Sequence, residues 1–263
     1  MSERADAMAR VRAYAQIMPE HAFFIGPTAA LIGAAPLPFG LHRELHVGVL
    51  APRSAPRRPG IRGRQLRVGS MHRYHGLRVA DVPTTWATLA THLDEYNLVT
   101  ATDHIIRIPR SPGGFHDLPR LDPLTDQAAL AAILSANRWH GAERLRRALD
   151  RARTGSSSRP ETWLRLTIID AGLPEPELDV DIFDGDGRFV ACADLAYPQL
   201  RISLDYEGEG HQEQRRFEHD INRFARLAEI RWDALRFTSQ HVFRDSGLGV
   251  ARIRRALERH HAT

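Results

Sequence analysis

The second half of the chain alternates between helical and extended patterns, and this order restricts the fold more than any other feature. Apolar residues recur every three or four positions in the expected helices and every second position in the expected strands. In chain order these elements are a helix at 160–171, strands at 178–182, 189–196 and 200–206, a helix at 212–229, a strand around 235–237 and a helix at 248–259. The sequence therefore predicts an α/β domain with the order αβββαβ, closed by one more helix.

A short polar segment separates this domain from the first half. Thr154 to Ser158 reads TGSSS, which is typical of a linker. We therefore expect a domain at 1–153 and a second domain at 154–263. The first is predicted as a smaller, mostly helical α+β domain with one clear strand, at 45–49.

Residues 51–64 contain no core pattern and are expected to form a basic loop. It carries the arginines Arg53, Arg57, Arg58, Arg62 and Arg64. Such a loop is either solvated or an arm that contacts phosphates. Two threonine caps are also expected, Thr28 before the helix TAALIGA and Thr84 or Thr85 before TTWATLATHL.

Three acids cluster around the third expected strand of the second domain. Asp205 and Glu207 are two residues apart, so their side chains are expected on the same face of the strand. Asp194 precedes the turn at Pro198 and can face them from the neighbouring strand. Carboxylates held together repel each other, and a divalent cation with oxygen ligands offsets that repulsion.

The stretch Asp205-Tyr206-Glu207-Gly208, followed by His211, resembles a motif of one nuclease group. That group, DUF559, is related to very-short-patch-repair endonucleases of the PD-(D/E)xK superfamily and reads Glu-Tyr-Asp-Gly followed closely by His. The opening SRPETWLRLTIIDAGLPEPE, from Ser158 to Glu177, is also similar. The resemblance implies a restriction-endonuclease-like αβββαβ core and a Mg²⁺- or Mn²⁺-dependent endodeoxyribonuclease.

The resemblance also implies roles for individual residues. Asp194 and Asp205 would be direct metal ligands, and Glu161 on the first core helix would assist the metal site. Glu207 stands where many superfamily members have Lys, and would orient or deprotonate the attacking water or bind a second cation. His211 would act as a general acid or contact the phosphate. Two alternatives stay open: Glu161 as a helix-start carboxylate and His211 as a hydrogen-bonded loop histidine.

The Asp-Tyr-Glu order departs from the usual Glu-Tyr-Asp, which changes the reach of both acids by one methylene group. The first domain is weakly similar to AbiEi-type antitoxins in FFIGPTAALIGAAPLP and GLRVADVPTTWATLA. Two functions therefore remain, a metal-dependent DNA endonuclease in repair or defence and a non-catalytic DNA-binding regulator or antitoxin. The acids favour the nuclease, because a pure DNA binder gains nothing from carboxylates facing a polyanion.

Composition sets broader limits. All 36 basic residues are arginine, and the formal net charge is +4, which points mildly to nucleic acid. Cys192 is the single cysteine, so an intramolecular disulfide is excluded. No apolar run suggests a secretion signal or a membrane span. We expect a soluble cytoplasmic protein, and the sequence does not indicate its oligomeric state.

Overall fold

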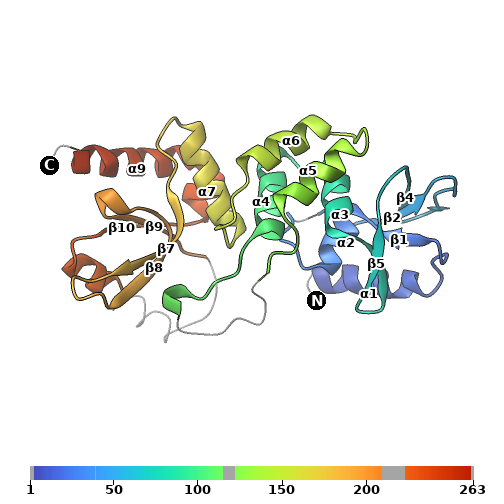
Figure 1. Ribbon diagram of the computed structural model, residues 1–263, viewed down its shortest axis with the longest axis horizontal. Coiled ribbons are helices and arrows are strands. Elements are labelled where there is room, and N and C mark those ends of the chain that lie inside the picture. The colour runs from blue at the N-terminus through green and yellow to red at the C-terminus, as the bar shows by residue number, and fades with distance from the viewer. Residues whose placement is uncertain (1–2, 39, 115–121, 209–222, 262–263) are drawn as a thin grey trace. The chain divides into compact units, whose positions relative to one another are not determined.

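The computed structural model describes residues 3–38, 40–114, 122–208 and 223–261. The chain divides into two units (Figure 1). Unit 1 comprises Met1–Arg107 and Pro123–Thr154, and unit 2 comprises Ile108–Asp122 and Gly155–Thr263. The segment 108–122, which was expected within the first domain, therefore belongs to unit 2. Unit 1 is the larger unit, so its expected smaller size is wrong.

Unit 1 combines helices with a six-stranded sheet. Its helices are α1 (Glu3–Ala15), α2 (Gly26–Ile32), α3 (Val82–Leu89), α4 (Glu95–Ile106), α5 (Gln127–Ser135) and α6 (Ala142–Arg151). Its strands are β1 (Ala22–Phe24), β2 (Leu45–Leu50), β3 (Arg57–Arg58), β4 (Ile61–Leu66), β5 (Met71–Tyr74) and β6 (Leu77–Ala80), in the order β3-β4-β2-β1-β6-β5. The prediction of one clear strand therefore missed most of this sheet.

The prediction of a basic loop at 51–64 is also wrong, because this segment contains β3 and most of β4. Strand β4 runs parallel to β2, with Leu45 opposite Ile61 and Leu50 opposite Leu66. Of the residues in β4, Leu66 is buried and the others are half-buried or exposed. The strand therefore lacks the apolar alternation that reveals strands in a sequence, and pairing with β2 defines it instead.

Both expected threonine caps are replaced by other residues. The carboxylate of Asp81 accepts a hydrogen bond from the Thr84 N–H at 2.9 Å and so caps α3. Helix α2 begins at Gly26, two residues before Thr28. The Thr28 hydroxyl accepts a hydrogen bond from the His46 N–H at 2.8 Å and links α2 to β2. The Thr28 hydroxyl, which local spacing predicted as a helix cap, thus makes a tertiary contact instead.

Unit 2 has a four-stranded sheet with the order β10-β9-β8-β7. Its elements are α7 (Arg159–Asp170), β7 (Glu177–Phe183), β8 (Phe189–Tyr197), a 3₁₀ turn at Pro198–Leu200, β9 (Ile202–Tyr206), helical residues 223–229, β10 (Asp233–Phe237), a π-helical turn at Gln240–Arg244 and α9 (Ser246–His261). Strands β7, β8 and β9 pair antiparallel, and β10 runs parallel to β9. A parallel pair cannot be joined by a tight turn, in contrast to the antiparallel pairs β7-β8 and β8-β9.

Two apolar clusters hold unit 2 together. One joins α7 and α9 to the sheet through Leu164, Leu204, Phe237 and Ile253. The other lies around Ile182, Ala193 and Ala196 and includes Leu227 of the helical residues 223–229. Strand β9 is consequently buried at Ile202 through Asp205, polar positions included. Among the described helices, none is long and apolar enough to cross a membrane.

Candidate functional site

Asp194 and Asp205 come together because strands β8 and β9 are antiparallel neighbours. Leu195 pairs with Leu204, and the same register sets Asp194 opposite Asp205. The Asp194 carboxylate accepts a hydrogen bond from the Tyr206 N–H at 2.9 Å. The two acids thus stand side by side on the central strands of the sheet, as their spacing around Pro198 predicts.

Asp205 is the more enclosed of the two, with 3% of its surface exposed. Its carboxylate forms an ion pair with Arg223 and accepts a hydrogen bond from the Ser203 hydroxyl at 3.2 Å. Arg223 also donates to the Cys192 carbonyl at 2.9 Å, so its guanidinium group bridges β8 and β9. Burial raises the pKa of Asp205, and Arg223 opposes that rise.

Asp194 is half-buried, and its pKa is affected by two neighbouring carboxylates. Burial first, and then the nearby carboxylates of Glu161 and Asp205, together raise its pKa to about 7 against the opposing effects of the Tyr206 N–H and Arg223. A carboxyl group that titrates near neutrality between two other acids is typical of a functional site. These three acids therefore form an interacting cluster, with Asp194 between the other two.

Glu161 serves the start of α7 as well as this cluster. Ser158 caps the helix, and the Glu161 carboxylate accepts a hydrogen bond from the Ser157 N–H at 2.7 Å. The carboxylate thus satisfies a backbone N–H just before the helix, and its negative charge in the first turn also favours the helix dipole. Its proximity to Asp194 gives it an electrostatic role at the same time. Both interpretations of Glu161 thus have support in the contacts.

Glu207 has a different partner from Asp205, although the two were expected side by side. Its carboxylate forms an ion pair with Arg236 of β10, and its N–H donates to the Phe237 carbonyl at 2.7 Å. His211 lies outside the described residues. The cluster of described acids is therefore Asp194, Asp205 and Glu161, with Glu207 held by β10.

The donor set suits a hard cation in part. In the chain segments that the structure describes, no group of three or more Asp, Glu, His or Cys side chains is placed to hold one metal ion. Mg²⁺, however, is usually bound through one or two carboxylates, with water and substrate oxygens completing its octahedron. Asp194 and Asp205 fit that smaller requirement, provided that Arg223 releases Asp205.

Unit 2 contains a second polar cluster, which was not predicted from the sequence. Arg110 forms ion pairs with Asp179 at 2.7 Å and with Asp181 at 2.8 Å, and it donates to the Cys192 sulfur at 3.3 Å. Asp179 has a φ angle of 54°, which turns its carboxylate toward Arg110 within strand β7. The alternating acids of β7 were a signal, but their basic partner lies about 70 residues earlier in the chain. This cluster ties segment 108–114 to the sheet.

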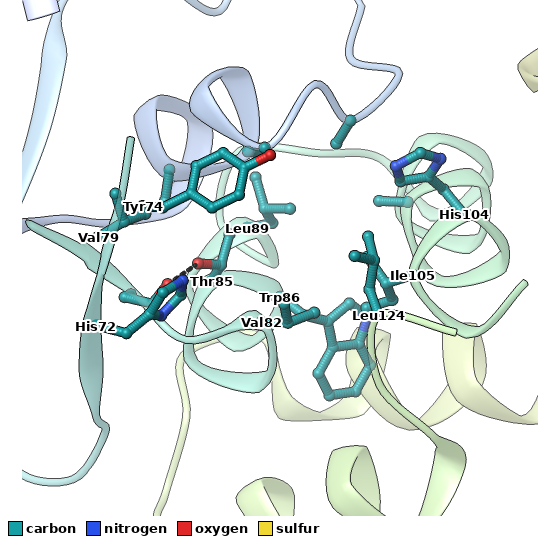
Figure 2. Close-up of a pocket in the computed structure, with 16 residues that line it drawn as sticks. His72, Tyr74, Val79, Val82, Thr85, Trp86, Leu89, His104, Ile105 and Leu124 are labelled. Atoms are coloured by element: carbon teal, nitrogen blue, oxygen red, sulfur yellow. Dashed lines mark hydrogen bonds between the residues drawn. The ribbon is translucent and has the colours of Figure 1, made fainter. Parts of the chain in front are cut away.

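Unit 1 contains an apolar pocket of about 150 Å³, shown in Figure 2. Small residues of α2 and the Trp86 ring of α3 line it, and His72, Tyr74 and His104 supply polar groups. It contains none of the acids predicted as site residues, all of which belong to unit 2.

Comparison with known proteins gives a partial match. The chain is 36% identical over 105 residues to an uncharacterized protein found in two strains of Mycobacterium tuberculosis, one of them H37Rv. The match covers 40% of this chain and 38% of that protein, so the chain spans about two fifths of the length of its curated relatives. No protein-family model matches the chain. No solved structure matches it either.

Proposed function

We propose that unit 2 is a metal-dependent endonuclease that hydrolyses DNA phosphodiester bonds. The observation that carries the proposal is the pair Asp194 and Asp205, opposed on adjacent central strands, both with raised pKa values. The order of elements, with β10 parallel to β9 beside an antiparallel β7-β8-β9 set, is the order that the PD-(D/E)xK resemblance implies. Fold order and acid position thus support the same proposal.

In this mechanism Asp194 and Asp205 would hold Mg²⁺ or Mn²⁺ through carboxylate oxygens. The cation, when bound, lowers the pKa of a bound water and neutralises charge on the phosphate. Glu161 adds negative charge beside Asp194 and so increases the affinity of the pair for a cation. Arg223 leaves Asp205 and donates its N–H groups to a substrate phosphate, for which a guanidinium fork is well suited.

Glu207 and His211 keep the roles that the resemblance implies. Glu207 orients or deprotonates the attacking water after Arg236 releases it, and His211 protonates the leaving oxygen or contacts the phosphate. The Glu207–Arg236 ion pair makes the first role testable, since a free carboxylate is needed for proton transfer.

A second function is favoured by the same ion pairs. Arg223 neutralises Asp205 and Arg236 neutralises Glu207, so two of the acids present little net charge to a polyanion. A DNA-binding regulator or AbiEi-type antitoxin that keeps a nuclease-like fold tolerates acids neutralised in this way. In that case the arginines hold the acids permanently, and no cation replaces them.

A cleavage assay separates the two functions. Plasmid and single-stranded DNA are incubated with Mg²⁺ or Mn²⁺ and with wild type, Asp194→Ala, Asp205→Ala or Asp186→Ala. Asp186 is the control, because it lies in the exposed β7–β8 turn. We expect metal-dependent cutting by wild type and Asp186→Ala, and its loss in the other two variants. DNA binding in a gel shift without cutting under either metal would favour the regulator.

A further inference from the structure

A basic cleft of about 470 Å³ lies on the sheet of unit 1. Its walls come from the loop before β2, from strands β2 and β4, and from the C-terminal end of α3 with the residues after it. Its charged and ring-bearing lining residues are Arg43, Glu44, His46, Arg62, Arg64 and His92. The cleft is separate from the acid cluster, since all of these residues belong to unit 1.

The register of the sheet brings these groups to one place. Parallel pairing sets His46 opposite Arg62 and Gly48 opposite Arg64. Because side chains alternate along a strand, Arg62 and Arg64 project to the same side of β4. Gly48 has no side chain, and Ile25, which also lines the cleft, packs against its backbone instead.

Arg64 is the residue of the cleft that most strongly indicates a ligand. It is half-buried, and within the described residues its guanidinium group has neither an ion pair nor a side-chain hydrogen bond. Burial lowers its pKa, which reflects the cost of taking a charge out of water without a counter-charge. Arginine is almost never fully buried without a partner, so a half-buried guanidinium group that lines a cleft without one is available to an anionic ligand.

The charge balance of the cleft also favours an anion. Three arginines and one carboxylate, that of Glu44, line the cleft. Glu44 forms an ion pair with Arg62 at 2.5 Å, so the other two arginines have no carboxylate in the cleft to pair with. The His46 and His92 rings meet edge to face with centroids 4.5 Å apart. Burial, followed by the neighbouring His92, lowers the pKa of His46 to about 4, so its ring is neutral at pH 7 and can still donate an N–H.

We infer that this cleft binds the phosphate group of a nucleotide or of a nucleic-acid backbone. Arg64 and Arg43 supply charged donors, and His46 and His92 supply neutral ones. Arginine forks match phosphate oxygens in pairs, which gives the site geometric selectivity as well as charge. The volume exceeds that of one phosphate group, so an attached sugar also fits.

Titration calorimetry in the presence of EDTA tests the inference with three probes: inorganic phosphate, a deoxynucleoside monophosphate and a short DNA duplex. Arg64→Ala and Arg43→Ala are compared with wild type and with Arg57→Ala, an exposed arginine of β3 outside the cleft. We expect affinity for at least one probe to fall about tenfold or more in both cleft variants and to stay unchanged in Arg57→Ala. Thermal melts confirm that each variant is folded.

The three probes identify the source of the phosphate. Binding of phosphate and nucleotide without duplex indicates a small ligand, and Arg64-dependent binding of the duplex indicates a nucleic-acid backbone. If no probe binds, or if both cleft variants bind as wild type does, the inference is overturned. Asp186→Ala serves as a second control, because this exposed carboxylate of the β7–β8 turn belongs to neither site, so its binding should equal that of wild type whether or not unit 2 is a nuclease.

Discussion

Arg223 in unit 2 and Arg64 in unit 1 are both partly buried arginines on the face of a sheet, but they differ in their partners. Arg223 is paired with Asp205 and also contacts a backbone carbonyl. Arg64 has no such partner among the residues described, and it lines an open cleft. The comparison separates an arginine that is paired within the fold from one that has no partner among the described residues.

The same contrast applies to the titratable groups around each arginine. In unit 2, acids are crowded and burial raises their pKa values, so one of them titrates near pH 7. In unit 1, burial is the main cause that lowers the pKa values of His46 and His92, followed by the His92 ring for His46 and by Arg64 for His92, so the rings stay neutral at pH 7. This contrast in charge is the reason why we propose a cation for unit 2 and an anion for the cleft of unit 1.

Replacing Arg223 is expected to have the largest effect on stability. Arg223→Met removes the counter-charge of Asp205 and leaves a carboxylate that is 3% exposed without its partner. Breaking a buried ion pair from one side costs about 3–5 kcal/mol of unfolding free energy. Urea denaturation measures it, with Arg226→Met as the control, because Arg226 is exposed on the same helical segment. Equal stabilities for the two variants would contradict a structural role for the pair.

Replacing Asp194 is expected to change how stability depends on pH. In the folded protein this carboxyl keeps its proton up to about pH 7, whereas in the unfolded chain it ionises near its ordinary value of 3.8. Its contribution to stability is therefore complete below pH 3.8 and is lost as the pH rises to about 7. Asp194→Asn cannot ionise, so above pH 7 it should be more stable than wild type by roughly 2–4 kcal/mol.

Denaturation curves from pH 4 to pH 8 in EDTA check this prediction. Wild type and Asp194→Asn should have similar stability near pH 4 and diverge as the pH rises. Parallel curves over the whole range would show that Asp194 is not the group with the raised pKa.

Arg110 is expected to have a smaller effect, because its side chain is 32% exposed. Arg110→Ala leaves Asp179 and Asp181 without their shared cation, at a cost of about 1–2 kcal/mol. The matched control is Arg188→Ala, whose pair with Asp186 is exposed on both sides and should contribute almost nothing. Hydrogen exchange adds a local test, since the Gly113 N–H donates to Asp181 at 3.0 Å and should exchange faster in Arg110→Ala.

Arg64 is expected to have the smallest effect on stability. Arg64→Ala removes a half-buried charge that no carboxylate compensates, so the unfolding free energy should change by less than about 0.5 kcal/mol or rise slightly. The measurement is urea denaturation beside Arg223→Met under the same conditions. A loss as large as that of Arg223→Met would mean that Arg64 has a structural role and would weaken the contrast between the two units.

Local signals made much of unit 2 predictable. Pro160 and Gly172 flank the expected helix at 160–171, and α7 occupies Arg159–Asp170 with Gly172 at a φ of 73°. The sequence Asp-Gly-Asp-Gly at 184–187 is typical of a hairpin turn, and the strands expected on either side, 178–182 and 189–196, match β7 and β8 within one residue at each end. These signals work because capping, turn and alternation patterns act over a few neighbouring residues.

The sequence by itself determined the order of elements in unit 2 and the meeting of Asp194 with Asp205, since a short turn between two strands leaves little choice of register. The tertiary structure decided what each charge contacts. Arg223 reaches Asp205, Arg236 reaches Glu207, Arg110 reaches β7, and β4 becomes a strand through β2. These contacts join residues far apart in the chain, and no local pattern encodes them, because charge pairing and strand pairing depend on which surfaces folding brings together.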